Sequence, residues 1–234
     1  MAVKRDYGSF AKASTRLLAP QVDALGYRPW HGGGFGREKA GWVEGFFLQQ
    51  SQWGSGDFCV NIGIHVPGLE DLWALDREER YFGLLIAWRL SDTASEHGGE
   101  RWYHAKNKEQ LEKNLKVVAV TLAKANGWFD QFRSFLDVVE QYRVRSGLPS
   151  APTGDLPGVA VLNYGLLLLL AEAKQEAARW LCFAGEILAR PLYWNAKTRT
   201  FSHEAAPGLK RMKPTKDDEL RRRVIDSALA RVES

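Results

Sequence analysis

The segment DFCVNIGIHVP, residues 57–67, decides the fold of the first half of the chain. Apolar side chains stand at every second position from Phe58 to Val66, and small or polar ones stand between them. Side chains of a β-strand point alternately to the two faces of a sheet, so this strict alternation predicts a strand with one apolar face. The intervening residues, which would line the other face, are Cys59, Asn61, Gly63 and His65.

The preceding segment GWVEGFFLQQSQ, residues 41–52, is also typical of a strand, and glycines follow it. A three-residue loop at Gly54–Gly56 would join the two strands into an antiparallel hairpin. That loop length would place Gln49 opposite Asn61. One face of the hairpin is then apolar, whereas the other presents amide, hydroxyl and thiol groups that can bind a partner or a covering loop.

Two further strands would complete a small sheet. One is expected around Arg37, and the other within residues 81–90, YFGLLIAWRL, although this segment is apolar at successive positions and could instead be a buried helix. Together these segments predict an α+β fold, with an antiparallel sheet of about four strands and helices on one face.

Helical periodicity appears on both sides of this region. Residues 8–26 predict an amphipathic helix that ends at a glycine. Asn107 and Gln110 have the spacing of a capping box, and Asn126 with Gly127 would close the helix that follows. A second helix is expected directly afterwards, so the two would form a helical hairpin.

The segment SGLPSAPTGDLPG, residues 146–158, holds three prolines and three glycines and is the best candidate for a linker. The predicted organisation is therefore an α+β domain over residues 1–145, a linker over 146–158 and a helical region over 159–234. Residues 159–190 read as one or two helices, and 192–213 as a loop or short hairpin. The longest apolar stretch, 159–171, is shorter than the roughly 20 residues of a membrane span.

The charge balance is mildly basic, with 32 Lys and Arg against 28 Asp and Glu and a formal net charge of +4. This permits nucleic acid or an acidic protein as a partner without requiring either. The basic run Arg221–Arg223 follows the acidic run Asp217–Glu219 at the spacing that supports a helix, which favours a solvated helix face. Two cysteines and no apolar leader at the N-terminus predict a cytoplasmic protein without membrane contact.

Motifs of catalysis are weak. The string HGGGFG, residues 31–36, matches the oxyanion loop of lipases, but the G-x-S-x-G elbow that supplies their serine does not occur in the sequence. A glycine-rich turn before a strand is the ordinary interpretation. The five histidines lack the spacings of common metal sites. We therefore expect no metal, no cofactor and no enzymatic activity.

The order of several short motifs resembles the bacterial domain-of-unknown-function family DUF4304 over about residues 8–140. The motifs are LGYRP, FGRE, FFLQQS, DFCVNIGI, IAWRL and RWY. The residues that match by position are Arg37, Gln49, Ser51, Phe58, Asn61, Gly63, Trp88, Arg89 and Trp102. Tyr103 departs from the pattern, because a second tryptophan is usual there, and residues 146–234 look like an added region.

The resemblance implies an α+β fold with an antiparallel sheet and no established chemistry. Its members resemble small cytoplasmic proteins of bacterial conflict systems, so we expect a non-enzymatic module that binds another protein, in an immunity-like or accessory role. The candidate partner-binding residues are Arg37, Gln49, Ser51, Asn61, His65, Arg89 and Trp102.

Two other functions are left open by the sequence. One is association with nucleic acid through Arg37, Arg89, the basic stretch 210–223 and exposed tryptophans. The other is an enzyme with an unrecognised site around Arg37, Gln49, Asn61 and His65.

Overall fold

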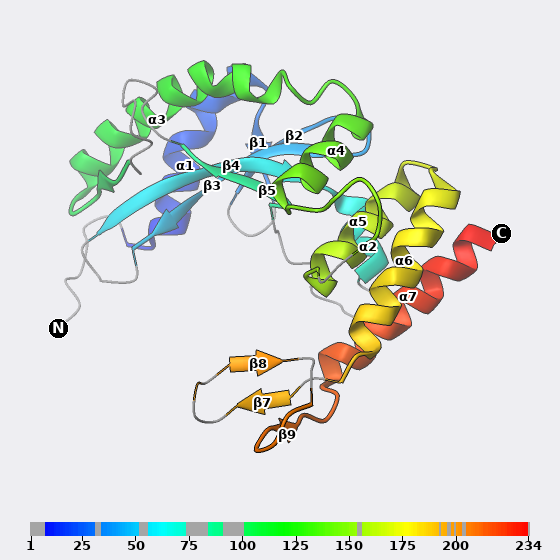
Figure 1. The fold of residues 1–234 in the computed structure, drawn as a ribbon. Helices are drawn as coiled ribbons and strands as arrows, with labels where there is room; N and C mark the ends of the chain where they lie inside the picture. The colour runs from blue at the N-terminus through cyan, green and yellow to red at the C-terminus, as the bar shows by residue number, and fades with distance from the viewer. Residues whose placement is uncertain are drawn as a thin grey trace. The chain divides into compact units, whose positions relative to one another are not determined.

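Figure 1 shows the protein as a computed structural model with an α+β architecture. It describes residues 8–30, 34–51, 56–73, 84–90, 101–153, 156–191, 193–195, 198, 200–202 and 205–233. The chain divides into two compact units, of which the first contains Met1–Glu70 and Glu78–Val138, and the second Asp71–Arg77 and Val139–Ser234. The linker at 146–158 and the boundaries drawn from it stay a prediction.

The first unit is built on an antiparallel sheet in the order β1-β2-β3-β4-β5, and β6 pairs with the end of β4. Its strands are β1 (Arg28–Pro29), β2 (Phe35–Glu38), β3 (Val43–Gln50), β4 (Asp57–His65), β5 (Ile86–Arg89) and β6 (Tyr103–His104). The predicted strands are confirmed. Within residues 81–90, which could also have been a helix, Ile86–Arg89 form the strand β5. The described sheet has six strands, not about four, because β1 and β6 are two residues long and too short to show a periodic pattern.

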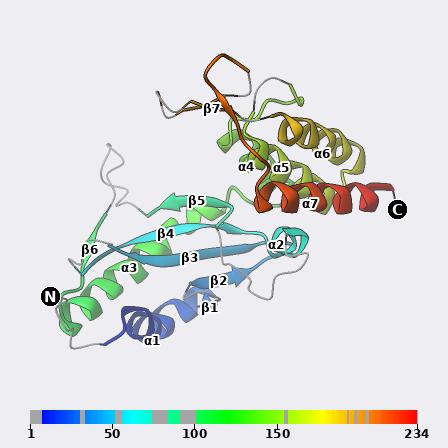
Figure 2. The ribbon, with the colours of Figure 1, turned by 90° about the horizontal axis from the view of Figure 1, so that it is seen from below.

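Two helices cover one face of this sheet: α1 (Phe10–Val22), which continues into the 3₁₀ turn η1 (Asp23–Leu25), and α3 (Lys108–Phe129). They lie side by side (Figures 1 and 2). The Phe10 ring of α1 lies 5.3 Å from that of Phe58 in β4. On the same face, the rings of Phe35 and Phe46 stack at 4.9 Å. The apolar side chains predicted by the alternation therefore form the core of the unit.

A side chain at the first turn of α3 fixes the start of this helix. Asn107 accepts a hydrogen bond from the backbone N–H of Gln110, as the sequence predicts for α3. The predicted end of this helix at Asn126 and Gly127 is wrong, because the helix continues to Phe129 and Asp130 N–H still donates to the carbonyl of Asn126. Gly127 has no left-handed φ, so it does not act as the terminating glycine that the sequence suggested.

The second unit contains the helices α5 (Gly158–Leu170), α6 (Lys174–Ala189) and α7 (Lys216–Glu233). It also contains a small antiparallel sheet in the order β8-β7-β9, whose strands are β7 (Tyr193–Asn195), β8 (Thr200–Ser202) and β9 (Lys210–Arg211). This confirms a helical C-terminal region with a hairpin before the last helix. The helices α2 (Pro67–Trp73) and α4 (Phe135–Arg145) contain two of the three points where the chain passes from one unit to the other.

Helices α5 and α6 approach each other closely at Gly165, where a Cβ would lie 3.0 Å from the side chain of Leu181. Trp180 is fully buried beside Tyr164. Asn163, the polar residue of the apolar α5, accepts a hydrogen bond of 2.8 Å from Trp73 Nε1. Helix α5 carries apolar side chains on all sides, which is typical of a buried helix. Within the described residues no helix combines the length and hydropathy needed to span a bilayer.

Neither cysteine forms a disulfide, and the two differ in access to solvent. Cys59 is buried in β4, whereas Cys182 is exposed on α6. Two predicted turns fall largely outside the described residues: 31–33 of the glycine-rich segment, and 52–55 of the β3–β4 connection. The strands that flank these two segments are antiparallel pairs, β1 with β2 and β3 with β4.

Two glycines allow a matched test of backbone packing. A Cβ at Gly63 of β4 would overlap the carbonyl oxygen of Ile86 in β5, whereas a Cβ at Gly127 would meet no atom within 4 Å. We expect Gly63→Ala to lower the free energy of unfolding by about 3 kcal/mol, because the two strands must separate. Gly127→Ala should raise it by about 0.5–1 kcal/mol through helix propensity. Urea unfolding of both variants measures the difference, and effects of the same sign would contradict the packing described.

Candidate functional site

The β3–β4 hairpin pairs in a different register from the predicted one. Gln49 faces Cys59, and Phe47 faces Asn61, so the pairing is displaced by two residues. The reason is a longer connection: Ser51 N–H donates to the carbonyl of Asp57, which leaves five residues between them in place of the predicted three-residue loop. A displacement of two residues keeps every side chain on its predicted face, because the side-chain period of a strand is two.

The predicted polar face is therefore present. Asn61 Nδ2 donates to Gln49 Oε1 at 3.1 Å, as a diagonal contact between β4 and β3. Asn61 is 8% exposed and Gln49 is exposed, so the pair links the interior of the sheet to its surface. This hydrogen bond fixes the orientation of the Gln49 amide and leaves its NH₂ group pointing away from Asn61.

Arg89 and Trp102 join this face from the next strands. Arg89 lies opposite Asn61 in the β4–β5 pairing, and its guanidinium carbon lies 5.7 Å from the centre of the Trp102 ring. The ring is 41% exposed. A guanidinium over an indole is attracted by the negative face of the ring, so the two side chains hold each other in place.

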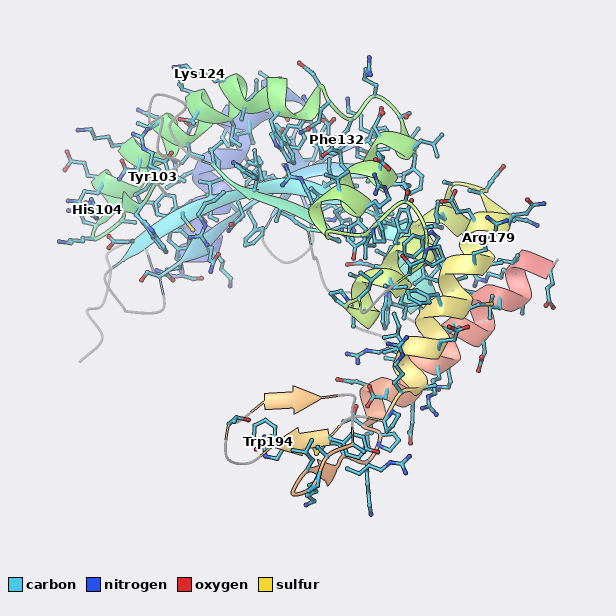
Figure 3. The ribbon with its side chains drawn as sticks, viewed as in Figure 1. Tyr103, His104, Lys124, Phe132, Arg179 and Trp194 are labelled. Carbon is cyan, nitrogen blue, oxygen red and sulfur yellow. The ribbon has the colours of Figure 1, made fainter. Side chains whose placement is uncertain are left out.

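A second polar pair lies on the same face, and the sequence did not single it out. His104 Nδ1 and Asp57 Oδ1 are 2.6 Å apart across the β4–β6 pairing. Figure 3 shows His104 beside Tyr103 at one end of the sheet, and the ring of Tyr103 stacks on Phe58 from the opposite face. Forty-seven positions separate His104 from Asp57, so no local spacing signals this pair.

Ser51 and His65 lie at opposite ends of the hairpin. Ser51 is half-buried and bonded through its backbone to Asp57. His65 is only 3% exposed, where Nε2 is 3.7 Å from a carboxylate oxygen of Glu70 and the ring makes an edge contact with Trp30. Four residues of extended strand between Asn61 and His65 span about 13 Å, so His65 is remote from the Gln49–Asn61 pair.

Arg37 lies on the opposite, helix-covered face. Its Nε donates to Glu44 Oε2 at 2.7 Å, and its Nη1 donates to the carbonyl of Leu25 at 3.1 Å. The guanidinium also lies 5.0 Å from the centre of the Tyr27 ring and 6.0 Å from that of Phe129. These contacts join β2, β3, η1 and α3, so Arg37 is a structural centre of the core.

Burial controls the chemistry around this pair. The Glu44 side chain is 3% exposed and also lies 3.7 Å from Lys39 Nζ. Burial raises the pKa of Tyr27 to about 12, a rise that the Glu44 carboxylate reinforces and the Arg37 guanidinium opposes. The Tyr27 hydroxyl is buried and has no hydrogen-bond partner among the described residues. The cluster is enclosed, and its groups serve stability.

The structure brings together five of the seven candidates, Gln49, Ser51, Asn61, Arg89 and Trp102, and adds Asp57 and His104 to them. We call these seven residues the polar sheet face. Within the described residues no group of three or more His, Cys, Asp or Glu side chains is arranged to hold a metal ion.

The Arg37–Glu44 pair gives a testable energy. Replacing Arg37 by Met leaves a buried carboxylate without its main partner, so we expect the free energy of unfolding to fall by about 3 kcal/mol. The double variant Arg37→Met with Glu44→Gln should recover most of this loss. Arg28→Met, which breaks the exposed pair with Asp23, is the control and should cost less than about 1 kcal/mol. Equal losses in both single variants, measured by urea unfolding, would contradict a buried pair.

Tyr27 predicts a pH dependence. Below pH 10 both the folded and the unfolded chain keep the phenol proton, and at higher pH only the folded chain holds it, up to about pH 12. The free energy of unfolding should therefore fall across this window, by about 2 kcal/mol more in the natural chain than in Tyr27→Phe. At neutral pH Tyr27→Phe should be at least as stable, because the hydroxyl it removes is unpaired. Urea unfolding of both proteins at neutral pH and across the window from pH 10 to about 12 measures this difference. If the free energy of unfolding of the two proteins changed with pH in parallel, the assignment to Tyr27 would be wrong.

One of three comparisons with known proteins found a match, and it covers most of the first unit. Residues 18–131 match the model of a family described as a domain of unknown function, DUF4304. Searches for similar curated proteins and for similar solved structures each found no match. The matched residues include β1 to β6, the polar sheet face and all of α3. Residues 18–131 of this chain, which carry the sheet and the candidate site, thus match the DUF4304 family.

Proposed function

We propose that the DUF4304 domain of this chain is a non-enzymatic module that binds another protein through the polar sheet face and the adjoining edge of β5. An immunity-like or accessory role in a bacterial conflict or defence system, in the cytoplasm, is part of the same proposal. The observation that carries it is the exposed, ordered Arg89–Trp102 pair.

The composition of this surface supports protein recognition. Trp102 is 41% exposed and stands next to β6, which pairs with the same edge of β4 as β5. Trp88 is 52% exposed on β5 but lies opposite Ile62, so it belongs to the other face at the edge of the sheet. Arg89 lies between them in the sequence and stacks on Trp102. Tryptophan and arginine dominate the energetic centres of protein interfaces, because they bury a large area and retain polar groups for directed bonds.

The rigidity of the surface supports the same function. Gln49 is held by Asn61, Trp102 by Arg89 and His104 by Asp57. Side chains that are already fixed lose little conformational entropy on binding, so their contacts contribute more to affinity. The strands beneath them provide the rigid scaffold that such a surface needs.

Nucleic-acid binding by this domain has less support. That alternative rests on Arg37, Arg89, exposed tryptophans and the basic stretch 210–223, which belongs to the second unit. Within this domain, Arg37 is turned to the helix-covered face and engaged by Glu44. Only Arg89 lies on the polar sheet face, and a strong phosphate contact requires several cations together. Nucleic acid is therefore an outcome that the experiment must distinguish.

The test uses proteins encoded beside the gene, titrated calorimetrically with the full chain. Once one of them binds, we expect Trp102→Ala and Arg89→Ala each to raise the dissociation constant about tenfold or more. Val120→Ala, which alters an exposed apolar residue on α3, is the control and should change it less than about threefold.

Three results would overturn the proposal. The first is that the partner binds Trp102→Ala as tightly as it binds the control variant Val120→Ala. The second is binding of duplex DNA that weakens steeply with salt and is lost in Arg89→Ala. The third is a catalytic activity of the chain that a single substitution in the polar sheet face abolishes.

A further inference from the structure

The second unit contains a groove of about 700 Å³ that the function proposed above does not use. It lies where three helix ends meet: the start of α5, the end of α6 and the start of α7. Figure 1 shows α7 beginning beside the end of α6, after the β7–β9 sheet. The volume is within the roughly 300–1,000 Å³ typical of sites for small molecules.

Positive charge is concentrated in this groove. Among the described residues that line it, five are cationic, Arg190, Arg211, Lys213, Arg221 and Arg222, and one, Asp218, is a carboxylate. The excess of four equals the formal net charge of the whole 234-residue chain. A concave surface with an excess of one sign focuses the potential and attracts ligands of the opposite sign.

The carboxylate of Asp218 is already engaged. One oxygen accepts hydrogen bonds of 2.8 Å from both the backbone N–H and the hydroxyl of Thr215, and the other lies 3.1 Å from Arg221. The Thr215 bonds hold the pKa of this carboxyl below its usual range. Asp218 therefore caps α7 and pairs with Arg221. No described carboxylate forms an ion pair with the other three cations that flank it in sequence, Arg211, Lys213 and Arg222.

The rest of the lining is aliphatic. Val159 comes from the start of α5, Leu188 from the end of α6 and Met212 from the segment after β9. Val159 and Met212 are each 39% exposed, so part of this aliphatic lining is open to a ligand. None of the lining residues that the structure describes is aromatic, so they provide no ring on which a base could stack.

We propose that this groove binds a small organic phosphate, with its phosphate group among Arg211, Lys213 and Arg222 and its apolar body against Val159, Leu188 and Met212. A phosphate monoester carries a charge of nearly −2 at neutral pH, which suits several cations better than a single carboxylate would. Arginine forks match phosphate oxygens in pairs, and the aliphatic floor adds the affinity that a free ion cannot obtain.

Calorimetric titration of the full chain with hexyl phosphate and with inorganic phosphate tests both halves of the site. We expect hexyl phosphate to bind about tenfold tighter or more, because part of its alkyl chain leaves water. Binding should weaken as salt is added, because the cations are partly exposed. Hexanol, which lacks the charge, should not bind measurably.

Variants separate the groove from the general charge of the protein. The double variant Lys213→Ala with Arg222→Ala should weaken the binding of hexyl phosphate about tenfold or more. Lys216→Ala removes a nearby cation of α7 outside the lining, and Lys124→Ala one on α3 (Figure 3); each should change affinity less than about twofold. Met212→Ala should reduce the difference in affinity between hexyl phosphate and inorganic phosphate. Circular dichroism confirms that each variant is folded.

The proposal is overturned if hexyl phosphate does not bind, or if the folded double variant binds it as tightly as the natural chain. It is also overturned if Lys216→Ala weakens binding as much as the double variant, which would indicate a diffuse field. Binding of duplex DNA or of an acidic peptide through these same cations, without binding of hexyl phosphate, would assign the groove to a macromolecule instead.

Discussion

Backbone pairing along both edges of β4 is the interaction on which the first unit depends. Strand β3 bonds to one edge over eight residue pairs, from Val43 with His65 to Gln50 with Phe58, and β5 and β6 share the other edge. One face of β4 is thereby held against α1 and α3, and the other face must carry the polar groups. Gly63 makes this possible, because any side chain there would force β5 away. The core and the candidate surface are thus two sides of one strand.

The alternation in residues 57–66 was sufficient to predict this strand and the division of its side chains between two faces. The register was not predictable from the sequence, because the glycines at 54 and 56 allow more than one loop length and the pairing ends at Ser51 and Asp57. The error did little harm to the site: a shift of two residues preserves the faces, so Gln49 and Asn61 still meet.

The roles of charged residues were harder to predict. Arg37 in FGRE reads as an exposed cation of a short strand, but the groups that enclose it come from Leu25 and Glu44 and, 89 positions away, Asn126. Periodicity reports which face a residue occupies and cannot report which distant elements cover that face. Glu44, alone among apolar neighbours in GWVEGFF, was the available signal that a buried partner had to exist. The basic run of α7 was interpreted as a solvated face, and only the fold shows that its first arginines border a groove.

The unequal exposure of the two cysteines has a practical consequence. A thiolate reacts with a maleimide only where the reagent can reach it, so under native conditions Cys182 is modified and Cys59 is spared. A fluorophore or spin label can then be attached to α6 alone, without engineering the sequence. Because this helix belongs to the second unit and the polar sheet face to the first, the label reports on one unit while leaving the other chemically untouched.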